Sequence, residues 1–118
     1  IAWFTSASDT AKVNVAFSND GGISFSDVIR IDEGNAIGRV DIDLIDQNSA
    51  LVTWMEGSVV KMTRVSKDGS KEASATLAES SNARSSGFPQ LAIAGDRAVV
   101  AWTEDKSKTI RTSLIAIN

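Results

Sequence analysis

The sequence predicts an all-β protein built from a repeated antiparallel unit of four short strands. The first observation is a period-two alternation of apolar and polar residues, clearest in 39–45, where Val40, Ile42 and Leu44 share one face. The second is a set of strings rich in β-formers that end in glycine-containing turns. The third is a tryptophan-centred pattern that recurs about every 48 residues.

The composition limits the chemistry available to the chain. Its 118 residues correspond to one small domain, and the formal net charge of −3 gives no basic face for nucleic acid. No apolar run reaches the ~18 residues of a membrane span. Cysteine, histidine and tyrosine are absent, which excludes thiolate nucleophiles, histidine bases and His/Cys zinc sites. The sequence therefore predicts no metal, no cofactor, no nucleic-acid partner and no membrane partner.

The repeat is visible at several separate places. Trp54 and Trp102 lie 48 positions apart, with the same Ala, Val and Glu neighbours, and the turn 66–69 follows the turn 18–21 at the same step. Trp3 precedes Trp54 by 51 positions, and the three extra residues fit in the loop "TSASDT", where insertions are tolerated. The segments "IGRVDIDL" and "SGFPQLAI" also correspond, with one residue of slippage.

Each element follows from a local pattern. Strand 50–55 is nearly all apolar, as expected of a strand covered on both faces, and Glu56-Gly57 makes a tight turn into the next strand. A weak last strand follows the "KDG" turn. In chain order, strands are expected at 12–17, 27–31, 39–45, 50–55, 59–65 and 73–78.

A four-stranded antiparallel sheet every ~45 residues is typical of a β-propeller blade, whereas a β-sandwich, the alternative, has no reason to repeat its sequence. The pattern places a partial blade at 1–33, a complete blade at 39–78 and a partial blade at 88–118. This single unit of about two and a half blades, which begins with Ile1 and not Met, is expected to be a fragment of a longer propeller, most simply its C-terminal part. Its unpaired sheet edges are expected to bind the remaining blades or a second copy.

The turn "SNDGGISF" carries a more specific signal. It matches the pattern S-x-D-x-G-x-[TS]-[WF], and so the chain resembles the sialidase-like propellers that contain this Asp-box, or bacterial neuraminidase repeat. "SKDGSKEA" is a degenerate second copy without the second glycine and the aromatic residue. The residues that carry the resemblance are Ser18, Asp20, Gly22, Ser24, Phe25, Ser66, Asp68 and Gly69.

The chemistry of the Asp-box turn favours a structural role. Asp20 can accept hydrogen bonds from turn amides, glycines permit positive φ, and Phe25 is expected to pack under the hairpin between blades. A calcium loop is the alternative, but only one carboxylate is present where an EF-hand supplies several oxygens. The resemblance places this turn at the periphery, on the face opposite the substrate.

Strand direction indicates where a ligand site would lie. The strands of each blade are counted from the hub of the propeller outward. The starts of the first strands and the ends of the second strands then meet on the face opposite the Asp-box turn. Each blade brings a cation and a carboxylate to this face. Asp105 lies near this rim, and Asp43 is expected to be paired structurally within its sheet. The alternative is that the rim charges are solvated or form salt bridges between blades. The candidate ligand-binding rim consists of Arg39, Asp41, Glu56, Arg84, Gln90 and Glu104.

Two functions remain open. The resemblance implies a non-catalytic, glycan-binding or scaffold propeller of a secreted or periplasmic bacterial protein. The alternative is the C-terminal part of a sialidase-like glycoside hydrolase, which binds the substrate carboxylate through arginines and uses a tyrosine nucleophile. Because the chain contains no tyrosine, that nucleophile would lie elsewhere, and this segment alone is expected to be inactive. The three tryptophans are expected in the core, with sugar stacking as the alternative.

Overall fold

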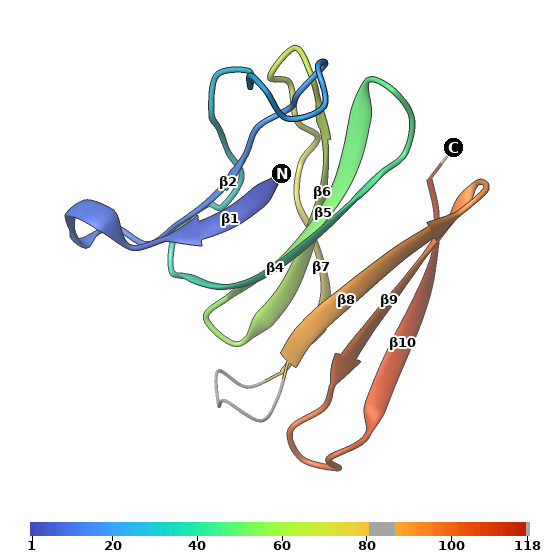
Figure 1. The fold of residues 1–118 in the computed structure, drawn as a ribbon. Coiled ribbons are helices and arrows are strands. Elements are labelled where there is room, and N and C mark those ends of the chain that lie inside the picture. The colour runs from blue at the N-terminus through green and yellow to red at the C-terminus, as the bar shows by residue number, and fades with distance from the viewer. Residues whose placement is uncertain (81–86, 118) are drawn as a thin grey trace.

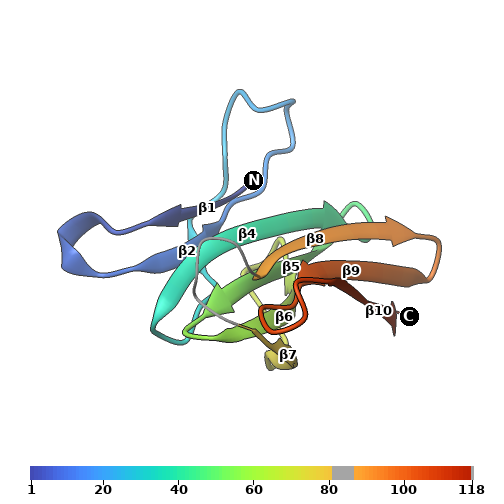
Figure 2. The ribbon, with the colours of Figure 1, turned by 90° about the horizontal axis from the view of Figure 1, so that it is seen from below.

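A computed structural model describes residues 1–80 and 87–117 and contains three antiparallel sheets that follow one another along the chain (Figure 1). The all-β prediction is confirmed. A view turned by 90° shows the same succession of sheets (Figure 2). A short 3-10 turn, η1 (Ala7–Asp9), lies in the first hairpin. No helix in the described ranges is long and apolar enough to cross a membrane.

The first and third sheets have three strands each. In the first, β1 (Ala2–Thr5) pairs with β2 (Lys12–Val15), which pairs with β3 (Ile29–Arg30). In the third, β8 (Gly87–Ala94) pairs with β9 (Arg97–Thr103), which pairs with β10 (Ile110–Ala116).

The second sheet has four strands, which pair in chain order. Its strands are β4 (Ala36–Leu44), β5 (Ser49–Glu56), β6 (Val59–Ser66) and β7 (Ala75–Glu79). These bounds differ by at most three residues from the predicted ones. Glu56 pairs with Val59 across a two-residue turn in which Gly57 has φ +53°, so the predicted tight turn is present.

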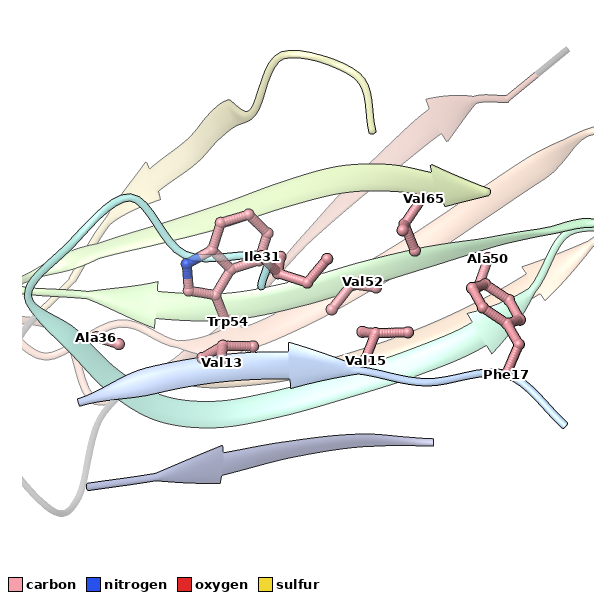
Figure 3. Close-up of a cluster of buried hydrophobic side chains, with 9 residues drawn as sticks. All are labelled: Val13, Val15, Phe17, Ile31, Ala36, Ala50, Val52, Trp54 and Val65. Carbon is pink, nitrogen blue, oxygen red and sulfur yellow. The ribbon is translucent and has the colours of Figure 1, made fainter. Parts of the chain in front are cut away.

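The sheets pack on one another by the same contact twice. β1 packs against β4, and β5 packs against β8. Because β1 and β5 carry the equivalent residues Trp3 and Trp54, each tryptophan-bearing strand meets the first strand of the next sheet. A buried cluster containing Val13, Val52 and Trp54 joins the first and second sheets (Figure 3). A second cluster containing Met55 and Trp102 joins the second and third. Trp3, in contrast, is only half-buried.

The first strands of the second and third sheets carry the same irregularity. In β4 the pairing skips two residues between Gly38 and Asp41, and in β8 it skips two between Gly87 and Gln90. Each bulge lies opposite a tryptophan, Trp54 or Trp102. The bulged residues Arg39 and Phe88 have φ of +53° and +51°, which is strained for side chains of this size. The repeat therefore extends to backbone conformation.

Candidate functional site

The Asp-box turn is held by the carboxylate of Asp20. Its Oδ1 accepts hydrogen bonds from the amides of Ile23 at 3.1 Å and Ser24 at 2.9 Å, and its Oδ2 accepts one from the Ser24 hydroxyl. The Ser18 hydroxyl donates to Asp20 Oδ1 and accepts from the Gly22 amide at 2.9 Å. Gly22 has φ +90°, a conformation that glycine adopts without strain.

These bonds stabilise the charged form of Asp20. The hydroxyl and amide of Ser24, together with the Ser18 hydroxyl, lower the pKa of Asp20 from 3.8 to about 2. Phe25, expected beneath the hairpin between blades, is instead 51% exposed and lines the groove beside the turn. The carboxylate, and not the aromatic ring, determines the shape of this turn.

The second copy of the motif forms a shorter turn. Asp68 Oδ1 accepts from the amide of Ser70 at 2.9 Å and from its hydroxyl at 2.6 Å, and these bonds lower the pKa of Asp68. Ser66 closes the turn by donating its amide to the Ser70 carbonyl. The two turns touch each other, since Lys67 Nζ donates to Asn19 Oδ1 at 2.6 Å. Lys67 and Asn19 occupy the same place in the motif, 48 positions apart.

One predicted rim residue, Arg39 on β4, meets an aromatic ring on β8. The Arg39 guanidinium lies 4.3 Å from the centre of the Phe88 ring, within cation–π range. Arg39 Nη1 also donates to Met55 Sδ at 3.5 Å. Gln90, two residues beyond Phe88, is exposed. Arg84 lies outside the described residues.

Asp41 and Asp43 bridge the exposed edges of β4 and β8. Asp41 Oδ1 accepts from the Ile42 amide and its Oδ2 from the Leu91 amide, at 2.9 and 2.8 Å. Asp43 repeats this with Leu44 and Ile93, at 3.0 and 2.9 Å. Both carboxylates of Asp41 and Asp43 thus connect two sheets. Asp43 has the structural role expected of it, although between sheets and not within one.

Glu56 is buried, with 8% of its surface exposed, and its two carboxylate oxygens have three partners. Oε1 accepts from the Glu33 amide at 2.6 Å and from Trp54 Nε1 at 3.0 Å, and Oε2 pairs with Lys61 at 3.1 Å. Lys61 also pairs with Glu33. Burial would lower the pKa of Lys61, but the hydrogen bonds that its ammonium donates to Glu56 and Glu33 outweigh the burial and raise that pKa.

Glu104 lies apart from the other rim candidates. It accepts a hydrogen bond from Arg111 Nε on the neighbouring strand, and Asp105 pairs with Lys108 at 2.8 Å in the following loop. Arg39, Asp41 and Gln90 therefore lie along β4 and β8, whereas Glu56 faces the first sheet and Glu104 faces β10. The structure does not bring all five described candidates to one point.

Sequence reasoning missed the buried carboxylate of Asp32. Its Oδ1 accepts from the Val13 amide at 2.7 Å, and both its oxygens bind the Arg30 guanidinium. Burial alone would raise the pKa of Asp32, but the Arg30 bond and the Val13 amide lower it. Only the Arg-x-Asp spacing was visible in the sequence, and it does not distinguish a buried pair from two solvated charges.

A groove of about 620 Å³ lies beside the Asp-box turn, on the face opposite the rim. Its apolar lining includes Ile1, Phe17, Phe25 and Leu44, and Lys67 lies among its polar groups. Within residues 1–80 and 87–117, no group of three or more acidic residues is arranged to hold a metal ion.

Comparison with known proteins gives no relative for this arrangement. No protein-family model matches the chain, no curated protein is similar to it, and no solved structure matches its fold. The assignment of function therefore rests on the geometry described above.

Proposed function

We propose that the chain is part of a sialidase-like Asp-box β-propeller that serves as a non-catalytic scaffold or glycan-binding module outside the cytoplasm. The observation that carries this proposal is the repeated packing of sheets, with β1 on β4 and β5 on β8. The contact between Lys67 and Asn19, at equivalent places of successive turns, supports it. Successive blades of a propeller stack in this way around an axis.

The glycan-binding face of the proposed module is formed by Arg39, Phe88 and Gln90. A guanidinium is suited to a carboxylate-bearing sugar because it offers two parallel N–H donors. Phe88 is 48% exposed and offers an apolar ring face, and Gln90, two residues later on β8, is an exposed polar residue. Apolar surface with a few convergent polar groups is the usual composition of a small-molecule site.

The carboxylates favour binding over catalysis. A glycosidase needs a carboxylate that can protonate a leaving group or assist a nucleophile. Asp41 and Glu56 have oxygens that already accept amide or indole hydrogens or pair with Lys61. The alternative of a glycoside hydrolase therefore gains no support from these two residues.

The test is binding of immobilised acidic and neutral glycans to the purified chain and to two variants. We expect Phe88→Ser to weaken binding of an acidic glycan at least tenfold, about 1.4 kcal/mol, because the ring under the sugar and under Arg39 is lost. Leu114→Ser is the matched control, since Leu114 is also exposed in the third sheet, at 59%, and lies away from the rim. Equal loss in both variants, or binding of no glycan by the chain, would contradict the glycan-binding proposal and leave the scaffold role.

A further inference from the structure

The dipeptide Asp-Gly occurs twice in the sequence, as Asp20-Gly21 in the Asp-box turn and as Asp68-Gly69 in the second turn. In this dipeptide the glycine nitrogen can attack the side-chain carboxyl carbon of the aspartate, because glycine has no side chain to obstruct the approach. Both pairs are exposed to solvent. Gly21 and Gly69 have φ of +73° and +92°, and each has open space where a Cβ would stand. Exposure and steric access therefore do not distinguish the two pairs.

The two aspartate carboxylates differ in how firmly their turns hold them. Asp20 accepts hydrogen bonds from two amides and two hydroxyls of its turn, and both of its oxygens take part. Asp68 accepts only from the amide and the hydroxyl of Ser70, and both bonds end on Oδ1. No residue in the described ranges donates to Oδ2 of Asp68. The Asp68 carboxyl group therefore breaks fewer bonds when it turns toward the following nitrogen.

The attacking nitrogens differ in the opposite direction, but by less. The Gly69 amide donates to the Ser66 carbonyl at 3.0 Å, whereas the Gly21 amide donates to no group in the described part of the chain. Hydrogen bonds to a charged acceptor are roughly twice as strong as those between neutral groups. The two additional bonds to the Asp20 carboxylate therefore outweigh the single neutral bond of Gly69, and the second turn is the more reactive of the two.

We propose that Asp68-Gly69 is a site of spontaneous isoaspartate formation, and that the hydrogen bonds of the Asp-box protect Asp20-Gly21 from the same modification. In the first step the Gly69 nitrogen bonds to Cγ of Asp68 and loses its proton, and one carboxyl oxygen leaves as water, which gives a five-membered succinimide. Water then cleaves the bond from this nitrogen to the original main-chain carbonyl carbon, so that the chain continues through the Asp68 side chain. The water released first is regained, and no other reactant is required. The proposal is independent of glycan binding.

The isoaspartyl linkage changes the second turn and its contact with the first. It adds a carbon atom to the main chain after Asp68 and moves the carboxylate away from Ser70. The Ser66 amide closes this turn by donating to the Ser70 carbonyl at 2.8 Å, and the Lys67 ammonium reaches across to the Asp-box turn. We expect the modification to weaken both of these contacts, so that the two turns separate as the protein ages.

Incubation of the purified chain at mildly acidic pH, followed by peptide mapping, measures isoaspartate at each pair. In the folded protein we expect Asp68 to react about tenfold faster than Asp20, which corresponds to about 1.4 kcal/mol in the barrier. In urea, where neither turn is formed, we expect equal rates, because glycine follows both aspartates. Three results would overturn the proposal: equal rates in the folded protein, a faster reaction at Asp20, or no isoaspartate at Asp68 when the unfolded chain forms it.

Two variants test whether the hydrogen bonds provide the protection. The double variant Ser18→Ala, Ser24→Ala removes both hydroxyl donors from the Asp20 carboxylate, so we expect the rate at Asp20 to rise toward that at Asp68. Ser70→Ala is the matched control, because it removes the hydroxyl donor of the second turn and should raise the rate at Asp68 alone. An unchanged rate at Asp20 in the double variant would overturn the protective role of the Asp-box. The comparison of the folded and unfolded wild-type chain requires no variant to fold.

Discussion

Asp20 accepts hydrogen bonds from the amides of Ile23 and Ser24 and from the Ser24 hydroxyl, in a turn that is exposed to solvent. Its carboxylate replaces the backbone pairing that a turn of this length lacks, as in other Asx-turns. The degenerate turn at Asp68 has bonds only to Ser70 and is correspondingly shorter. The difference between the two copies therefore lies in how many amides one carboxylate reaches.

The Asp20 turn should depend on pH in a defined direction. Because its folded pKa, about 2, lies below the ordinary value of 3.8, its contribution to stability is present above pH 4 and is lost as pH falls through 2. We expect its carboxyl signal to titrate near 2 in nuclear magnetic resonance. The amides of Ile23 and Ser24 should lose hydrogen-exchange protection over the same range.

Asp20→Asn should remove that protection at neutral pH, because an amide cannot accept from both Ser24 groups through two oxygens. Asp27→Asn, in the same loop, is the control, since the Asp27 carboxylate accepts no hydrogen bond from the described residues. Unchanged protection of Ile23 and Ser24 in Asp20→Asn would contradict the role given to this carboxylate.

At the scale of elements, β4 and β8 expose edges toward one another, and Asp41 and Asp43 satisfy four of their amides. Charged groups that occupy edge donors prevent a sheet from pairing with unrelated strands. Arg39 and Phe88, in the bulges of the same two strands, stack on each other. The first strands thus contribute both the polar and the aromatic contacts between these sheets.

The double variant Asp41→Asn, Asp43→Asn should lower the free energy of unfolding by about 2 to 4 kcal/mol, because each substitution weakens bonds that depend on a charged acceptor. Urea denaturation measures this value. Hydrogen exchange should show the loss at the amides of Leu91 and Ile93 first. Asp96→Asn, in the β8–β9 turn, is the control and should change stability by less than about 0.5 kcal/mol.

At the scale of the whole molecule, local patterns predicted the strands well and the site less well. Alternation in 39–45 and the apolar string 50–55 predicted β4 and β5, and the repeat predicted that Trp54 and Trp102 are buried. Glu56 looked like a rim group because strand direction places it at an exposed end. The burial of Glu56 depends on its contacts with Glu33 and Lys61, which are distant or on another strand. The bond between Asp41 and Leu91 spans 50 positions. Local sequence patterns therefore predict neither the burial of Glu56 nor the bridge made by Asp41.

The two buried clusters determine how the molecule should unfold. β5 contributes Trp54 to the cluster shared with the first sheet and Met55 to the cluster shared with the third. The second sheet therefore cannot open without exposing both clusters, whereas the first and third sheets can each separate alone. Cooperative units of this kind are resolved by native-state hydrogen exchange.

Val13→Ala and Val100→Ala test this arrangement as reciprocal controls, because both valines are fully buried, one in the first cluster and one in the second. Each substitution should cost about 2 kcal/mol through lost burial and the cavity left behind. Val13→Ala should reduce amide protection in β2 and leave β9 unchanged, and Val100→Ala should do the reverse. Equal loss of amide protection in all three sheets for both variants would contradict this arrangement. It would show that the three sheets unfold as one unit, because the second sheet would not persist after either neighbouring sheet had separated.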